Sequence, residues 1–418
     1  MKISFYTLGC KLNQAETDEL KKELTKISFL VVPWGEKCDI AIVRACGVTM
    51  GASQTTREII RQAKRRGAYV VATGCLENNT MTEIDFGAGT NEEIMEHLTN
   101  VIASEAKQSP RDEIATSPTA PRDDNDKTRA FIKIQNGCNF NCAYCIIPHF
   151  RGRTQSISTK EIIKKIKSAE KNNFKEVILT GVNVCLYRDE TSPYPLLGKE
   201  RVTDLANLLK IILEKTKIPR IRLGSLDPRL IPDKLISLYK NPRLLPHMHL
   251  SLQSGSDKIL KAMNRNYTAN SYYEIVAKTR ALNPLFSFTT DIIVGFPCET
   301  KKDFKASCDF VKKCKFTKVH VFPFSPRPGT QAAQIKNIVQ DKTKTERVKK
   351  LIKISDMIGK KFAKQFIGQT RPVLFEQQQK NQTDWFGYTP EYIRIKQSSK
   401  QKLEKIIVHI KIAAKNLK

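Results

Sequence analysis

The sequence lacks the long apolar runs of a membrane protein. In its 418 residues no apolar run approaches the ~18 residues that a helix needs to cross a bilayer. It begins Met1-Lys2-Ile3-Ser4-Phe5-Tyr6, without the basic and then apolar segments of a secretory signal. We therefore expect a cytoplasmic protein without a membrane span.

Acidic residues are scarce as well. The chain has 71 Lys and Arg against 42 Asp and Glu, a formal net charge of +29, and residues 336–418 alone hold 20 basic and 7 acidic side chains. Such an excess indicates a polyanionic partner rather than a particular fold. We expect this partner to be nucleic acid; a solvated basic surface is the alternative.

Disulfides are not expected among the 11 cysteines, because a reducing compartment keeps cysteines as thiols or metal ligands. The length exceeds that of one ordinary core, and a hydrophobic content of 40% is enough to build two or three domains.

Three of the cysteines lie in one short loop. Cys138, Cys142 and Cys145 form the pattern CxxxCxxC directly after a strand-like run, Ala130–Gln135. Soft thiolate ligands at this spacing suit an iron–sulfur cluster or zinc. Three protein ligands leave one iron of a four-iron cluster open to a small molecule. We interpret the loop as the site of a reactive cluster.

The first hundred residues repeat a strand that ends in a cysteine. Cys10, Cys46 and Cys75 each follow a strand-like run, and helix-compatible stretches lie between the strands. This alternation favours a parallel sheet, in which ligands bind at the C-terminal edge of the strands. We predict a second three-thiolate site there, with three buried, apolar cysteines as the alternative. The predicted elements are strands Lys2–Leu8, Asp39–Arg44 and Ala68–Thr73, and helices Glu16–Lys26 and Ser53–Arg66, the latter capped by Ser53.

Residues 102–127 interrupt this pattern. They are small, polar and rich in proline, and they cannot bury a core. We interpret them as a mobile, disordered linker. The segment also resembles the translated palindromic repeats that interrupt genes in some intracellular bacteria, which implies an insertion without function.

After the cysteine loop, strand–helix units continue to about residue 324. With Ala130–Gln135 there are six, fewer than the eight of a closed barrel, so we predict an open (β/α)6 barrel with active groups on its C-terminal loops. The further strands are Lys175–Thr180, Arg220–Leu223, His247–Leu252, Ser287–Val294 and Lys318–Phe324. The helices are Thr159–Lys171, Asp204–Glu214, Asp233–Tyr239, Asn270–Ala281 and Lys301–Lys313.

The C-terminal part is basic, helical through Phe366 and then β-type. The short β runs predict a small β-barrel with a basic face, an architecture that often binds nucleic acid. Its aromatic residues either stack on bases or fill the module's own core. These are Trp385, Phe386, Tyr388 and Tyr392, interleaved with Arg394 and Lys396. The predicted strands are Arg371–Glu376, Glu391–Lys396 and Lys405–Ile412, separated by turn-rich Gln377–Gly387.

These motifs resemble those of a known family. CxxxCxxC with Tyr144 before its last cysteine is similar to the signature of radical S-adenosylmethionine enzymes, and the upstream cysteines make the pattern resemble the methylthiotransferase branch. Residues 387–394 look like the TRAM domain of that branch. The resemblance covers everything except residues 102–127. Further matching motifs are TLGCKLNQ at 7–14, LTGVN at 179–183, HLSLQSGS at 249–256, MNR at 263–265, DIIVGFP at 291–297 and FSPRPGT at 324–330.

The two ends of the chain look most like the branch that acts on tRNA bearing N6-threonylcarbamoyladenosine. This resemblance implies methylthiolation of C2 of that nucleoside at position 37, adjacent to the anticodon. The alternatives are an isopentenyladenosine tRNA, whose enzymes usually open with Tyr-Gly-Cys-Gln-Met-Asn, or a ribosomal-protein aspartate. Departures from the family pattern spare every expected cluster ligand. They are Arg44, Gly47, Cys185, Gly224, Asp227 and Cys298.

The resemblance also implies the domains and cofactors. It places a methylthiotransferase domain in residues 1–101, a radical core in 128–365 and a TRAM-like RNA-binding domain in 366–418. Two 4Fe–4S clusters are implied: the one at Cys138, Cys142 and Cys145 cleaves S-adenosylmethionine to a 5′-deoxyadenosyl radical, and the one at Cys10, Cys46 and Cys75 carries the sulfur.

No catalytic side chain beyond the clusters is expected. By resemblance, S-adenosylmethionine contacts Tyr144, Gly181, Ser225, Gln253, Val294 and Phe324; capping of loops by these strand-end groups is an equal alternative. Arg151 and Arg153, with His149 nearby, either position phosphate or are simply solvated.

The implied partners are a tRNA anticodon stem-loop, an electron donor of the flavodoxin or ferredoxin type and a sulfur source. We expect the chain to be a monomer. A hypothesis of another class is a non-catalytic RNA-binding protein with zinc at both sites. Structural zinc normally has a fourth protein ligand, which two three-cysteine sites lack. A third hypothesis is a degenerating copy, against which the retention of all six cysteines argues.

Overall fold

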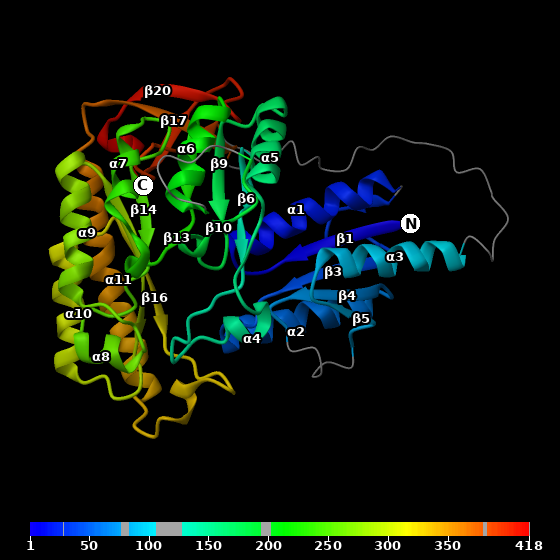
Figure 1. Cartoon of the computed structure of the whole chain (residues 1–418), viewed down its shortest axis with the longest axis horizontal. Coiled ribbons are helices and arrows are strands. Elements are labelled where there is room, and N and C mark those ends of the chain that lie inside the picture. The colour runs from blue at the N-terminus through cyan, green and yellow to red at the C-terminus, as the bar shows by residue number, and fades with distance from the viewer. Residues whose placement is uncertain (28, 77–82, 106–127, 194–201, 379–382, 418) are drawn as a thin grey trace. The chain divides into compact units, whose positions relative to one another are not determined.

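The structure is a computed structural model, and it describes residues 1–27, 29–76, 83–105, 128–193, 202–378 and 383–417 (Figure 1). The described residues form two compact units. The first holds those up to 105 together with His149–Arg151, and the second holds the remainder from 128 onward. Within the described ranges, no helix is both long and apolar enough to cross a membrane.

The first unit is a parallel sheet between two helical layers, as predicted. The sheet order is β2-β1-β3-β4-β5, and every neighbouring pair is parallel. Helices α1 and α3 pack on one face of the sheet and α2 on the other, around two separate apolar cores. The elements are β1 Lys2–Thr7, α1 Lys11–Lys26, β2 Leu30–Val32, β3 Ile40–Ala45, α2 Met50–Arg65, β4 Tyr69–Gly74, β5 Phe86–Ala88 and α3 Asn91–Glu105.

Helix boundaries in this unit differ from the prediction. Helix α2 begins one turn early, and the side chain of Thr49 accepts from the N–H of Ala52 at 3.2 Å, so Ser53 is not the cap. Helix α1 begins at Lys11 rather than Glu16, directly after Cys10. Helix α3 continues to Glu105, four residues into the predicted linker; residues 106–127 lie outside the described ranges.

The second unit contains the predicted open barrel. Six strands appear at the predicted places and a short seventh, β13, is added. They form the parallel groups β12-β9-β6 and β13-β14-β15-β16, with a bridge between Ile221 and Leu244. Helices surround the strands (Figure 1), and the shared core lies between the two layers. The strands are β6 Arg129–Lys133, β9 Glu176–Thr180, β12 Arg220–Leu223, β13 Ser225–Leu226, β14 His247–Leu250, β15 Ser287–Val294 and β16 Lys318–Pro323. The longer helices are α5 Thr159–Lys171, α6 Leu205–Lys215, α7 Asp233–Ser237, α8 Asp257–Ala262, α9 Ala269–Leu282, α10 Lys301–Cys314 and α11 Asp341–Lys364.

Short elements connect these larger ones. Helix α4 Ile147–Arg151 follows the cysteine loop, and the two-residue strands β7 Gln135–Asn136 and β8 Gln155–Ser156 pair on either side of it. A second short hairpin pairs β10 Arg188–Asp189 with β11 Thr203–Asp204.

The C-terminal module is a four-stranded antiparallel half-barrel, in agreement with the predicted class. The strand order is β19-β18-β17-β20. Strand β18 covers the end of the segment Gln377–Gly387, which was predicted to be turn-rich, so the prediction missed this strand. The strands are β17 Thr370–Gln378, β18 Asp384–Tyr388, β19 Arg394–Ser398 and β20 Ile407–Lys411.

The aromatic residues of this module pack inward. Trp385 and Phe386 are buried, and the rings of Tyr388 and Tyr392 stack with centroids 4.8 Å apart. The guanidinium of Arg222 lies 4.5 Å from the Tyr392 ring centroid. These side chains therefore fill the module and its junction with the barrel, so the base-stacking alternative is not favoured.

A buried ionic cluster holds the module on the barrel. Glu176 accepts from Arg222 at 2.9 Å and lies 3.8 Å from Arg220. Arg222 also donates to the carbonyl of Pro390 at 3.2 Å, and Arg220 to that of Pro372 at 2.6 Å. One carboxylate thus supports two arginines that bind backbone oxygens of the C-terminal module.

Candidate active site

The three N-terminal cysteines lie at one edge of the first sheet. Cys46 and Cys75 directly follow β3 and β4, and Cys10 follows β1 at the N-cap position of α1. Strands β1, β3 and β4 are neighbours, so their carboxyl ends place these cysteines together. Burial is the largest cause that raises the pKa of Cys75, and the charges of Cys10 and Cys46 raise it further.

A glycine allows this approach. Gly9 has φ +93, and a Cβ there would lie 3.1 Å from the Sγ of Cys46. A side chain at position 9 would therefore both strain the backbone and crowd a thiol. Glycine before Cys10 is thus a packing requirement of the three-cysteine edge.

An arginine contacts the buried member of this trio. Within the first unit, Arg151 Nε lies 3.4 Å from Cys75 Sγ, and its two terminal nitrogens donate to Glu16 at 2.7 Å and to Asn13 at 2.5 Å. The charge of Glu16 raises the pKa of Arg151 although burial opposes it, so Arg151 is a fixed cation. Arg151 was expected either to position phosphate or to be solvated. Its contact with Cys75 was not predicted.

The CxxxCxxC loop of the second unit is held by its backbone. Gly137 has φ +68, and a Cβ there would lie 2.0 Å from the carbonyl oxygen of Arg153. Cys138 donates its N–H to Gly152 at 3.1 Å, and Ala143 donates to Met263 at 3.0 Å. The loop is therefore fixed at its start and at its middle before any ligand binds.

Gln135 joins this loop to the next strand of the barrel. Its fully buried side chain donates to the carbonyl of Gly137 at 2.6 Å and to Thr154 at 2.8 Å, and it accepts from the N–H of Asn183 at 2.9 Å. A Cβ on Gly181 would lie 2.7 Å from the backbone oxygen of Gln135. The close contact that requires glycine at 181 is thus with Gln135.

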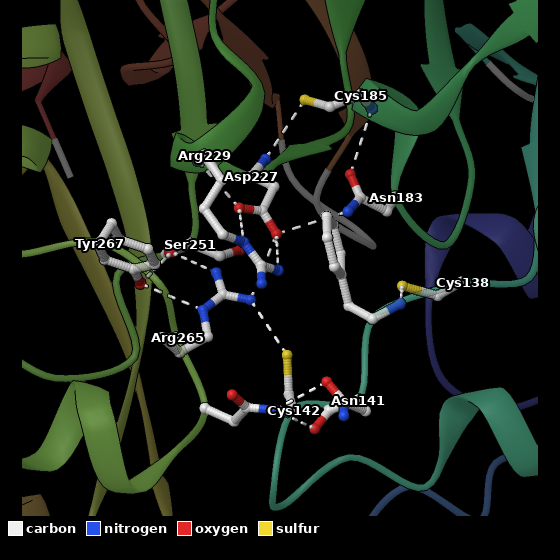
Figure 2. A network of polar contacts seen from close by, with 12 residues as sticks. Cys138, Asn141, Cys142, Asn183, Cys185, Asp227, Arg229, Ser251, Arg265 and Tyr267 are labelled. Carbon is white, nitrogen blue, oxygen red and sulfur yellow. Dashed lines mark hydrogen bonds and ion pairs between the residues drawn. The ribbon is translucent and has the colours of Figure 1, made fainter.

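An arginine also contacts the second trio. Figure 2 shows Arg265 pointing at Cys142, with Nη1 3.5 Å from Sγ and 3.3 Å from Asp227. Asp227 also binds Arg229 in a two-pronged pair at 2.6 and 2.9 Å, and the Arg229 guanidinium lies 3.6 Å from the ring centroid of Phe140. Burial opposes ionisation of Asp227, but Arg229 and Arg265 hold its pKa below the usual value.

The three thiols of the second trio face one cavity of about 150 Å³. Of the residues expected to contact S-adenosylmethionine, Tyr144, Ser225 and Gln253 line this cavity, as does Val182 next to Gly181. Val294 and Phe324 are instead buried in the cores beside it. Burial raises the pKa of Cys145 to about 12, so a metal must displace the thiol proton on binding.

Each trio offers three thiol side chains as possible metal ligands. Among the residues that the structure describes, no three His, Cys, Asp or Glu side chains are placed as ligands of one metal ion. The donor set, three soft thiolates without a fourth protein ligand, suits a 4Fe–4S cluster with an open iron.

Several supporting residues were missed by sequence reasoning. Asn13 and Arg265 lie in motifs that indicate only a resemblance to the family. Arg44 and Asp227 stand out in the sequence only as departures from the family pattern. Glu16 was taken as the start of a helix, and Gln135 as the end of a strand. A polar residue within a motif could have indicated a supporting role, but the sequence does not identify its partner.

Comparison with known proteins supplies the class. A family model described as "Radical SAM superfamily" matches residues 132–311, and one described as "Uncharacterized protein family UPF0004" matches residues 2–95. The chain superposes on TsrM, a radical S-adenosylmethionine methyltransferase from Kitasatospora setae, with TM-score 0.57 and 15% identity over 79% of this chain and 77% of that one. The fold is therefore that of a radical S-adenosylmethionine enzyme.

Closer relatives define the branch. The chain is 34% identical over 391 residues to "Threonylcarbamoyladenosine tRNA methylthiotransferase MtaB" of Thermotoga maritima, covering 90% of this chain and 86% of the relative. It is 35% identical to the protein of the same name from Rickettsia prowazekii, covering 88% and 86%. A Wolbachia pipientis "tRNA-2-methylthio-N(6)-dimethylallyladenosine synthase" is 31% identical, covering 92% and 90%. The chain belongs to the radical S-adenosylmethionine methylthiotransferase family, which implies one 4Fe–4S cluster and S-adenosylmethionine.

Proposed function

We propose that the protein methylthiolates C2 of N6-threonylcarbamoyladenosine adjacent to the anticodon of tRNA. The observation that carries this proposal is the presence of two separate three-cysteine sites in one chain, Cys138, Cys142 and Cys145 on the barrel and Cys10, Cys46 and Cys75 on the first sheet. One site is enough to cleave S-adenosylmethionine. A second thiolate site is needed if the chain also holds the sulfur that it transfers.

The described residues fit these groups. Cys138, Cys142 and Cys145 would hold the cluster that, with S-adenosylmethionine bound, supplies a carbon-centred radical. Tyr144, Ser225 and Gln253 line the same cavity and are proposed to contact S-adenosylmethionine. Gly181, Val294 and Phe324 are proposed contacts that do not themselves line it. Cys10, Cys46 and Cys75 would hold a second 4Fe–4S cluster. The charge of +29 supports an RNA substrate.

Two cysteine variants test the division of labour. Cys138→Ala should abolish cleavage of S-adenosylmethionine to 5′-deoxyadenosine, because the cavity loses one ligand of the reducing cluster. Cys46→Ala should retain cleavage and lose methylthiolation of tRNA. The matched control Cys38→Ala alters a thiol that contacts Ser4 at 3.0 Å on the first sheet and should leave both reactions intact. If Cys138→Ala and Cys46→Ala both cleave S-adenosylmethionine, the assignment is wrong.

A second candidate substrate is isopentenyladenosine tRNA. It is favoured by relatives named for that product, which are 31–32% identical to this chain. The proposed partners follow from either substrate: a tRNA anticodon stem-loop, an electron donor of the flavodoxin or ferredoxin type, and a sulfur source. A tRNA substrate also implies a cytoplasmic location. Both nucleosides are distinguished by mass, so one analysis of modified tRNA separates the candidates.

A further inference from the structure

Arg151 is bound on every nitrogen of its guanidinium. Nε donates to Cys75 Sγ at 3.4 Å, Nη1 to Glu16 Oε1 at 2.7 Å and Nη2 to Asn13 Oδ1 at 2.5 Å. The Arg151 and Glu16 side chains are 6% and 7% exposed. The cation is therefore held in one position and one orientation, with its Nε–H directed at the thiol.

A second arginine shares the carboxylate of Glu16. Glu16 is shared, because its second oxygen accepts from Arg44 Nη1 at 3.0 Å, and the Arg44 side chain is only 3% exposed. Arg44 is further held by Asn91 at 2.5 Å. Glu19 also acts on Arg44, but from a half-buried position where water screens it. One buried carboxylate, Glu16, thus pairs with two buried arginines.

We infer that Arg151 sets the reduction potential of the cluster held by Cys10, Cys46 and Cys75. A charge-assisted hydrogen bond to a ligating thiolate stabilises the state with more negative charge, which is the reduced cluster. Arg151 is a positioning residue, because it acts through Cys75. Glu16 opposes this effect of Arg151, because its negative charge lies beside the same guanidinium. This inference rests on the proposed second cluster.

Arg151 lies close in sequence to the CxxxCxxC loop. Arg151 is the sixth residue after Cys145, the last ligand of the CxxxCxxC loop, yet His149–Arg151 groups with the first unit. The segment that supplies the last ligand of one cluster therefore continues directly into the residue that contacts a ligand of the other.

A purely structural ion pair makes different predictions. If Arg151 only neutralised Glu16, replacing either residue would lower the stability of the fold and leave the potential of the cluster unchanged. If Arg151 acts on the cluster, the two replacements shift the potential in opposite directions. Arg151→Gln removes a positive charge and a donor, whereas Glu16→Gln removes a negative charge and leaves the donor in place.

The test uses the full-length chain with Cys138, Cys142 and Cys145 all replaced by Ala, so that only the N-terminal trio can hold a cluster. After anaerobic reconstitution with iron and sulfide, dithionite supplies one electron to the cluster, and electron paramagnetic resonance follows the titration. In this background, Arg151→Gln should shift the midpoint potential to a more negative value, Arg151→Lys should lie between, and Glu16→Gln should shift it to a more positive value.

Arg153→Gln is the matched control, because Arg153 is exposed and belongs to the second unit; its midpoint should equal that of the parent. Equal midpoints for the parent, Arg151→Gln and Glu16→Gln would overturn the inference and leave the proposed function standing. A parent that binds neither iron nor sulfide would overturn the proposed second cluster. If Arg151→Gln does not fold, the opposite shifts of Arg151→Lys and Glu16→Gln still decide.

Discussion

The ionic cluster at Glu176 makes the attachment of the C-terminal module testable. The Glu176 side chain is 1% exposed and pairs with Arg222, which is 0% exposed. Removing one member of a buried pair costs about 3–5 kcal/mol, since it leaves the other charge without compensation. Glu176→Gln keeps an oxygen acceptor, so we expect about 3 kcal/mol. For a unit of this size the melting temperature should fall by roughly 5 °C.

The dependence of stability on pH is a second test of the direction of this effect. Burial opposes ionisation of Glu176, but Arg222 and Arg129 hold its pKa below the usual value. A carboxyl whose pKa is lower in the folded state stabilises the fold above its unfolded pKa, about 4.3, and this contribution is lost as the pH falls through the folded pKa. The difference between parent and variant should therefore be constant near neutral pH and shrink in acid.

The assay is thermal unfolding of the metal-free chain followed by circular dichroism between pH 7 and pH 3. Glu214→Gln is the control, because Glu214 is 55% exposed and its pair with Lys210 spans 4.0 Å; such a pair contributes about 0.5 kcal/mol or less. If Glu176→Gln melts as the control does, the cluster does not hold the module on the barrel.

Three further predictions follow from the site. Gly137→Ala should prevent assembly of the CxxxCxxC cluster, because a Cβ there would lie 2.0 Å from a carbonyl oxygen; iron content should drop by about half, whereas Gly51→Ala, where a Cβ meets nothing within 4 Å, should not change it. Arg265→Gln should make the potential of that cluster more negative, measured by redox titration with Cys46→Ala as background; an unchanged midpoint would contradict the role of the Cys142 contact. Arg394→Gln, at an exposed residue, should weaken tRNA binding in filter assays and reduce the salt slope by about 1 if it contacts phosphate; an unaltered slope would exclude that contact.

The fold was largely predictable because its signals are local. Each barrel strand is a short run bounded by turn residues, and each cysteine of the first sheet follows directly on such a run. The missed strand β18 follows residues rich in Gln and Asn, and its Trp385 and Phe386 were predicted either to stack on bases or to fill the module's own core, without a strand to carry them. Thr49 was missed as a cap because the sequence after it offers Ser53 as a second plausible cap.

The grouping of the cysteines into two trios was predictable, but the residues around them were not. Spacing in the sequence identifies Cys138, Cys142 and Cys145. Nothing in the sequence states that Arg151 turns toward Cys75, or that Glu16 is shared by two arginines, since these contacts join residues 76, 135 and 28 positions apart. Buried charges of this kind are decided by packing, which a linear pattern does not specify.

The central claim is that this chain methylthiolates N6-threonylcarbamoyladenosine in tRNA. The most direct measurement is mass spectrometry of tRNA nucleosides from a strain in which the gene is deleted, compared with the parent and with strains that carry the intact gene or its Cys46→Ala variant. The account predicts that the 2-methylthio form of N6-threonylcarbamoyladenosine disappears on deletion, that the unmodified form accumulates, and that only the intact gene restores the parent pattern. Unchanged methylthio-adenosines in the deletion strain would contradict it.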